Sequence, residues 1–118
     1  MKPIQKFVRL LLPLALTLAP AVYADNAFPA QKLTGEKIYE QSCVVCHGTD
    51  GEGGMPGIPD LTGKSGLLSK ADDVLLNNIA QGMQSPGSVL AMPAKGGNPA
   101  LDAEDLRRVL QYLRQTFQ

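Results

Sequence analysis

The residues with the clearest chemical potential in this sequence are its two cysteines and its single histidine. They stand together in the run Cys43-Val44-Val45-Cys46-His47. Two thiols three residues apart on a helical turn can each form a thioether with one vinyl group of a porphyrin, and the next residue can offer an imidazole nitrogen to the iron. This C-x-x-C-H spacing is the attachment signature of a c-type haem. The sequence therefore predicts one covalent haem c, attached at Cys43 and Cys46, with His47 as an iron ligand.

Three other kinds of site use paired cysteines. A thioredoxin-like redox pair begins a helix that follows a strand, whereas residues 34–42 have the pattern of a helix. A zinc site needs more ligands than two thiolates and one imidazole. A disulfide across two intervening residues closes a loop too small to stabilise the fold much. These alternatives stay open, but only the haem prediction gives His47 a role at this spacing.

The first 24 residues have the composition of a secretory signal peptide. Basic residues at positions 2, 6 and 9 precede an apolar stretch over residues 7–18, and Val22-Tyr23-Ala24 supplies small residues at the positions that signal peptidase reads. We therefore expect cleavage after Ala24. The alternative is an uncleaved anchor, although twelve apolar residues are fewer than the roughly 20 that a membrane span needs.

Cleavage would leave 94 of the 118 residues. We expect a leader segment over residues 25–33 and one small domain over residues 34–118. Cleavage removes three of the eleven basic residues and none of the eleven acidic ones, so the remaining net charge is −3. This charge argues against nucleic acid as a partner. The domain has no tryptophan and few other aromatic residues, and a buried porphyrin would supply the apolar area that so small a core lacks.

The hydrophobic pattern predicts an all-α domain without strands. Thr34 is placed to cap a helix that runs into the cysteines. Ser69-Lys70-Ala71-Asp72 has the form of a capping box, and it predicts a helix with Ala71, Val74, Leu75 and Ile79 inward and Gly82 as its stop. Acidic residues 102–105 predict the start of a last helix. The residues expected on the inward face of that helix are Leu106, Val109, Leu110, Leu113 and Phe117. Loops are expected over residues 48–66 and 84–100.

Four segments in this order resemble the class I mono-haem cytochromes c. They are the helix that ends in the Cys43–His47 run, Pro59-Asp60-Leu61-Thr62-Gly63, Ala91-Met92-Pro93-Ala94-Lys95-Gly96-Gly97, and the last helix with Val109-Leu110-Gln111-Tyr112-Leu113. The Met-Pro-x-Lys-Gly-Gly segment is most similar to the bacterial cytochrome c5 group. The resemblance covers residues from about 33 to the end, and it implies a small fold of about three to five helices around one haem.

The resemblance also implies a role for individual residues. His47 and Met92 would be the two axial ligands of the iron, and Pro93 would fix the direction of the chain after Met92. The Pro59 carbonyl would accept a hydrogen bond from the other imidazole nitrogen, and Leu61 would pack on the haem. Gly35 and Tyr39 would cross the last helix near Val109 and Tyr112. Met55 and Met83 are expected to be filler.

The expected function is electron transfer in a bacterial periplasm. Both axial positions would be filled, so we expect an electron carrier without substrate turnover of its own. We also expect that it meets donor and acceptor proteins only transiently. After cleavage we expect a monomer with no membrane span. The first alternative is a haem c subunit of a periplasmic dehydrogenase or terminal oxidase complex. The second is a haem protein that binds or senses a small ligand at an open sixth position.

Overall fold

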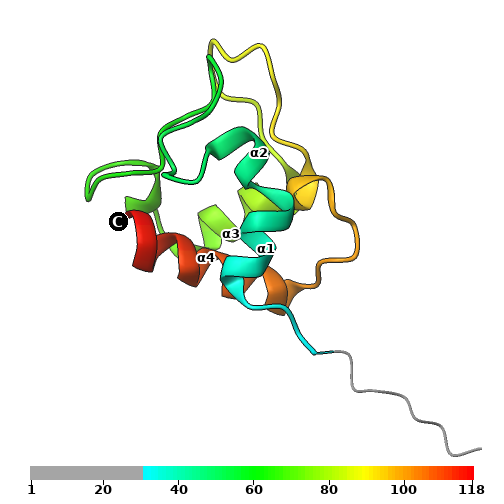
Figure 1. Ribbon diagram of the computed structural model, residues 1–118. Coiled ribbons are helices and arrows are strands. Elements are labelled where there is room, and N and C mark those ends of the chain that lie inside the picture. The colour runs from blue at the N-terminus through cyan, green and yellow to red at the C-terminus, as the bar shows by residue number, and fades with distance from the viewer. Residues whose placement is uncertain (1–30) are drawn as a thin grey trace, which may run out of the picture. The chain divides into compact units, whose positions relative to one another are not determined.

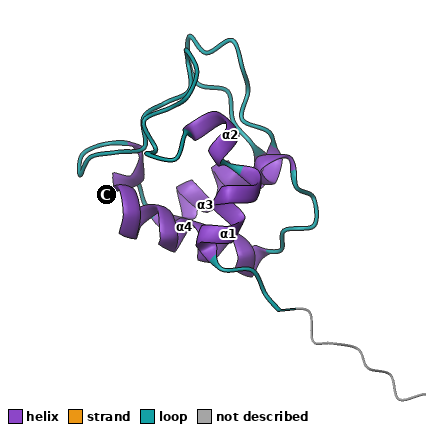
Figure 2. Cartoon of the chain, viewed as in Figure 1, coloured by secondary structure: helices purple, strands orange, loops and turns teal. Residues whose placement is uncertain are grey.

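The computed structural model describes residues 31–118, which form four α-helices joined by long loops (Figure 1). The predicted signal peptide and most of the predicted leader segment lie outside the described residues. The helices are α1 (Gly35–Ser42), α2 (Val44–His47), α3 (Asp72–Gln81) and α4 (Ala103–Phe117), with short 3-10 turns η1 (Leu67–Ser69) and η2 (Ala94–Gly97). No strand occurs in this part of the chain (Figure 2), which confirms the all-α prediction.

Helix α1 crosses α4 at very short range, and the crossing depends on a glycine. Thr34 caps α1 as predicted, because its side chain accepts a hydrogen bond from the Lys37 N–H. A Cβ atom on Gly35 would lie only 2.2 Å from the carbonyl oxygen of Arg108 and 2.8 Å from Cβ of Tyr112. Any larger residue would therefore force the helices apart. The predicted contact of Gly35 with the last helix is confirmed.

Helix α4 supplies much of the core. Asp102 accepts hydrogen bonds from the N–H groups of Glu104 and Asp105, and the Asp105 side chain accepts one from the Asp102 N–H, so the helix begins with a complete capping box. All five residues predicted to face inward are buried, namely Leu106, Val109, Leu110, Leu113 and Phe117. The rings of Tyr39, Tyr112 and Phe117 meet in one cluster with centroids 5.3 to 6.1 Å apart.

Helix α3 begins differently from the prediction. Its N-cap is Ala71, which makes no side-chain capping bond, so the predicted capping box that opens at Ser69 is wrong. Ser69 ends η1, and its hydroxyl donates instead to the Gly66 carbonyl. The Arg114 guanidinium of α4 fixes this turn by donating to the Lys70 carbonyl at 2.7 Å and to the Asp72 carboxylate at 2.6 Å.

The inward face of α3 is also narrower than predicted. Leu75 is buried and Ile79 packs against the core, but Val74 is 44% exposed and Ala71 is exposed. Gly82 ends the helix with φ 76°, as predicted. No helix within residues 31–118 is long and apolar enough to cross a membrane.

Parts of the two long loops run side by side beyond α2, at the top of Figure 1. The first loop is closed on itself by the Leu61 N–H, which donates to the Gly51 carbonyl at 2.8 Å, and it is tied to α4 by the Gly63 N–H, which donates to the Phe117 carbonyl at 3.1 Å. The second meets the first where a Cβ on Gly57 would lie 3.2 Å from Cα of Ser88. The two loops and α2 thus enclose one region of the molecule.

Candidate cofactor site

The cysteine and histidine run forms the junction between α1 and α2. Cys43 separates the two helices, and its carbonyl accepts hydrogen bonds from the N–H groups of Cys46 at 3.2 Å and His47 at 3.0 Å. No disulfide joins the two cysteines, and they line one cavity together with His47. Val45, which lies between the cysteines, is 84% exposed. The turn therefore directs the reactive side chains inward and Val45 toward solvent.

This cavity has two adjoining parts. The larger has a volume of about 200 Å³ and lies between α2 and the loop that carries Met92 and Pro93. The smaller has a volume of about 80 Å³ and lies against the core, where Leu61, Leu68 and Val109 form its wall. Five residues line both parts, namely Cys43, His47, Pro59, Met83 and Met92. A thiol, an imidazole and two thioethers, all possible ligands or attachment points for a cofactor, therefore lie where the two parts of the cavity meet.

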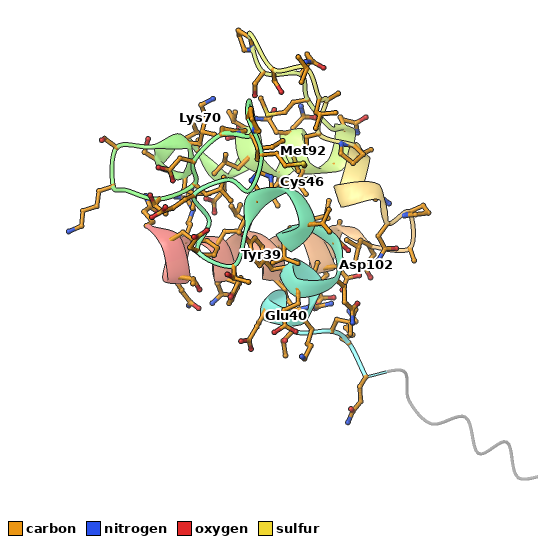
Figure 3. All side chains as sticks on the ribbon, turned by 45° about the horizontal axis from the view of Figure 1, so that its top comes forward. Tyr39, Glu40, Cys46, Lys70, Met92 and Asp102 are labelled. Atoms are coloured by element: carbon orange, nitrogen blue, oxygen red, sulfur yellow. The ribbon has the colours of Figure 1, made fainter. Side chains whose placement is uncertain are left out.

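Met92 lines both parts of the cavity, and it is paired with a second methionine. The Met83 N–H donates to the Met92 carbonyl at 3.1 Å, and the Met92 N–H donates to the Met83 carbonyl at 2.8 Å, so the two residues form an isolated antiparallel bridge. Figure 3 shows Met92 near Cys46 in one view, and both residues line the larger part of the cavity. The bridge fixes the position of Met92 at the base of its loop.

Burial controls the protonation of the groups in the cavity. It lowers the pKa of His47, and the Pro59 carbonyl opposes this effect only in part, so the imidazole is neutral at pH 7 and its lone pair is free for a metal ion. Burial, with a smaller effect of Cys46, raises the pKa of Cys43 to about 11. A redox-active C-x-x-C pair instead needs a thiol with a lowered pKa. The site is therefore unlike a thioredoxin centre.

Residues 30–113 match the family model described as "Cytochrome C oxidase, cbb3-type, subunit III". The chain belongs to the cytochrome c family. As a class I mono-haem cytochrome c it contains covalently bound haem c, and its function is that of an electron-transfer protein. The predicted superfamily and cofactor are thus confirmed, while the closer likeness to the cytochrome c5 group stays a prediction.

Two kinds of relative are similar to this cytochrome. A cytochrome c-555 from Chlorobaculum tepidum is 29% identical over 99 residues, which cover 84% of this chain and 89% of the relative. A cytochrome c-555 from Chlorobaculum thiosulfatiphilum is 33% identical over 67% of this chain and 88% of the relative. The cbb3-type cytochrome c oxidase subunit FixP from Bradyrhizobium diazoefficiens is 32% identical over 83% of this chain, but the aligned part spans only 33% of FixP.

The residues of the cavity fit a c-type haem. Nδ1 of His47 is buried and has no hydrogen-bond partner within residues 31–118, although the Pro59 carbonyl is close enough to raise the pKa of the ring. A buried nitrogen without a partner costs about 1–3 kcal/mol. An unpaired Nδ1 is expected if the imidazole takes its final orientation only when Nε2 binds iron. In that orientation the Pro59 carbonyl would accept a hydrogen bond from Nδ1.

The structure brings every predicted site residue to this one cavity. Cys43, Cys46, His47, Pro59, Met92 and Pro93 line its larger part, and Leu61 is buried in the wall of its smaller part. Met55, expected to be filler, lies on the surface with 38% exposure. Met83 was also expected to be filler, but it faces the cavity beside Met92. The signal that could have located it is the stop of the helix at Gly82, which turns the next residue back toward the core.

Proposed function

We propose that this cytochrome is an exported periplasmic electron carrier in which Cys43 and Cys46 attach the haem and His47 and Met92 are the axial ligands. One observation carries the proposal: a single cavity is lined both by the C-x-x-C-H turn and by Met92, which comes from a separate loop. One short turn supplies the two thiols and the imidazole, and a second segment, 45 residues after His47, supplies a thioether. This is the donor set of a closed electron-transfer site.

When bound, the haem supplies an iron that gains and loses one electron. The thiols of Cys43 and Cys46 would hold the porphyrin at the junction of α1 and α2. His47 would offer a neutral imidazole, and the Pro59 carbonyl would accept from its other nitrogen and so orient the ring. The sulfur of Met92 is a soft donor that favours the ferrous state, which raises the reduction potential relative to a second histidine.

The inner wall keeps water away from the site. Leu61, Leu68 and Leu75 are buried with 2 to 8% exposure, and Val109 and Leu113 of α4 close the same wall. An apolar surrounding controls solvent access and dielectric, and through them the potential. Because side chains occupy both axial positions in this proposal, the protein has no position at which it would bind a substrate.

The rim of the cavity favours brief contact with partner proteins. Residues 41–49, 53–59 and 76–94 contain no lysine, arginine, aspartate or glutamate. Val45 and Val89 are 84% and 87% exposed, and Leu90 is 45% exposed. A small, apolar and uncharged contact suits short-lived redox encounters, which have small interfaces. Partners would be recognised by fit to this rim rather than by charge.

Export is part of the proposal and is supported by the amino-terminal sequence. Three basic residues, the apolar stretch and Val22-Tyr23-Ala24 predict cleavage after Ala24. Mass spectrometry of protein from the periplasmic fraction is expected to give a chain that begins at Asp25. A mass that includes residues 1–24 would instead indicate an anchored carrier.

The second candidate is a haem c subunit of a terminal oxidase or dehydrogenase. The family model is named for a cbb3-type oxidase subunit, and FixP and the CcoP subunit of Rubrivivax gelatinosus, which is 32% identical over 72% of this chain, carry such names. Purification from detergent-solubilised membranes distinguishes the two functions. A carrier is recovered alone, whereas a subunit is recovered with other polypeptides at a fixed ratio.

An anaerobic redox titration with optical detection tests the carrier proposal. We expect one reversible one-electron transition, and ferrous protein that binds carbon monoxide only slowly, because a side chain must first leave the iron. A His47→Ala variant is expected to lose the transition, while Met55→Leu, on the surface, leaves it unchanged. Rapid and tight binding of carbon monoxide by the native ferrous protein would refute the proposal in favour of a ligand-binding haem protein.

A further inference from the structure

The distal wall of the cavity contains two thioethers, although one axial position needs only one. Met83 and Met92 both line the larger and the smaller part of the cavity, together with His47. Both side chains are half-buried. Met55, the other methionine within residues 31–118, does not line either part. Met83 and Met92 are therefore the two thioethers that line the cavity, beside the thiols of Cys43 and Cys46.

The antiparallel bridge fixes how these two side chains are related. In a pair that exchanges both backbone hydrogen bonds, as Met83 and Met92 do, the Cα atoms are about 5.5 Å apart. The side chains of such a pair lie on the same face, with Cβ atoms about 4.5–5.5 Å apart. Either sulfur can thus reach the same region by a change of its side-chain torsion angles, without a new backbone path.

Two further features hold the bridge in place. A Cβ atom on Gly82 would lie 2.5 Å from the Met92 carbonyl oxygen and 2.8 Å from the Ala94 N, so the close approach of the two segments requires glycine there. The intervening loop is closed by its own hydrogen bonds, in which the Ser88 N–H donates to the Ser85 carbonyl at 3.1 Å and the Ser88 hydroxyl donates to the Leu90 carbonyl at 2.7 Å.

We propose that Met83 is a reserve axial ligand, whose sulfur binds the iron whenever Met92 leaves it. This inference rests on the proposed axial role of Met92. The Met83 thioether is held next to the vacated position, so its effective concentration there is high and it competes well with water and small ligands. It has the same soft donor character as the thioether of Met92. The reserve ligand keeps the sixth position closed, which suits an electron carrier and excludes a ligand sensor.

Leucine variants of the intact haem protein test this proposal, because leucine has nearly the volume of methionine but lacks the sulfur. We expect Met92→Leu to keep the sulfur-to-iron absorption band of the ferric protein, with a shifted wavelength. The double variant Met83→Leu with Met92→Leu is expected to lose the band and bind carbon monoxide rapidly. Met55→Leu is the matched control and changes neither property. Loss of the band in Met92→Leu alone would overturn the reserve role.

The single variant Met83→Leu provides a test that does not depend on the stability of Met92→Leu. It is expected to keep the band, since Met92 remains, but to bind carbon monoxide at least about twofold faster, because the open state is no longer recaptured by a second sulfur. An unchanged rate would overturn the proposal. Loss of the band in Met83→Leu, with the band kept in Met92→Leu, would make Met83 the native ligand and would refute the axial assignment of Met92 instead.

Discussion

Replacement of Gly35 by alanine probes the crossing of α1 and α4, which sets the position of the cysteine turn. The added Cβ would stand 2.2 Å from the Arg108 carbonyl oxygen and 2.8 Å from Cβ of Tyr112. Neither group is the end of a flexible side chain, so neither can move aside on its own. The helices must separate by about 1 Å, and a gap of this size forfeits a quarter to a half of each dispersion contact across the interface.

The cost can be estimated from comparable substitutions. Overpacking of a well-packed core costs about 1–3 kcal/mol, while alanine in place of glycine stabilises a helix by up to about 1 kcal/mol. Because Gly35 is the first residue of α1, the gain is small and the clash dominates. We expect Gly35→Ala to lower the free energy of unfolding by about 2 kcal/mol, which corresponds to roughly 10 °C in melting temperature for a domain of this size.

Guanidinium denaturation of the holoprotein, followed by circular dichroism, measures this loss. Gly54→Ala is the matched control, because a Cβ on Gly54 would find its nearest neighbour at 3.5 Å, an ordinary contact, and its effect should stay within about 0.5 kcal/mol. If Gly35→Ala is as stable as the wild type, or more stable, the described crossing of the two helices is wrong.

Three further predictions concern the core, the cap and the rim. Leu113→Ala should lower the free energy of unfolding by about 3 kcal/mol, whereas exposed Gln115→Ala should not, and equal denaturation midpoints would contradict the described core. Asp102→Ala should lower the melting temperature at pH 7. The hydrogen bond from the Asp105 N–H is the main reason that the pKa of Asp102 lies below 3.8 in the folded protein. The difference in melting temperature between wild type and variant should therefore persist above pH 3.8 and vanish as the pH falls through the pKa of folded Asp102. A difference in melting temperature that grows in acid would disprove this prediction. Electron self-exchange, measured by NMR line broadening, should change less than about tenfold between low and physiological ionic strength, and a larger change would reveal a charged rim.

Features encoded within a few adjacent residues were predictable from the sequence. The Cys43–His47 run identified the cofactor, and Asp102 with the periodic apolar residues after it identified α4 and its buried face. The close approach at Gly35 was also expected, from the resemblance to the family. In each case the residues that decide the structure are neighbours in sequence or belong to a known motif.

Features set by distant contacts were missed. Ser69 has the sequence of a helix cap, but the helix begins only at Asp72. Arg114, more than 40 residues away, donates hydrogen bonds to the Lys70 carbonyl and the Asp72 carboxylate and so stabilises a non-helical turn before that residue. Met83 resembles filler until its pairing with Met92 is known. The sequence also did not indicate that the Lys95 ammonium group donates to the Leu101 carbonyl at 2.8 Å, a contact that braces the loop after Met92.

Peptide mass analysis of the oxidised holoprotein after trypsin digestion tests the central claim most directly. Cleavage after Lys37 and Lys64 releases residues 38–64, which contain Cys43, Cys46 and His47. The proposed site predicts that this peptide carries one haem through two thioether bonds, with no free thiol left to alkylate. A peptide of unmodified mass, or one with a Cys43–Cys46 disulfide and no haem, would contradict it.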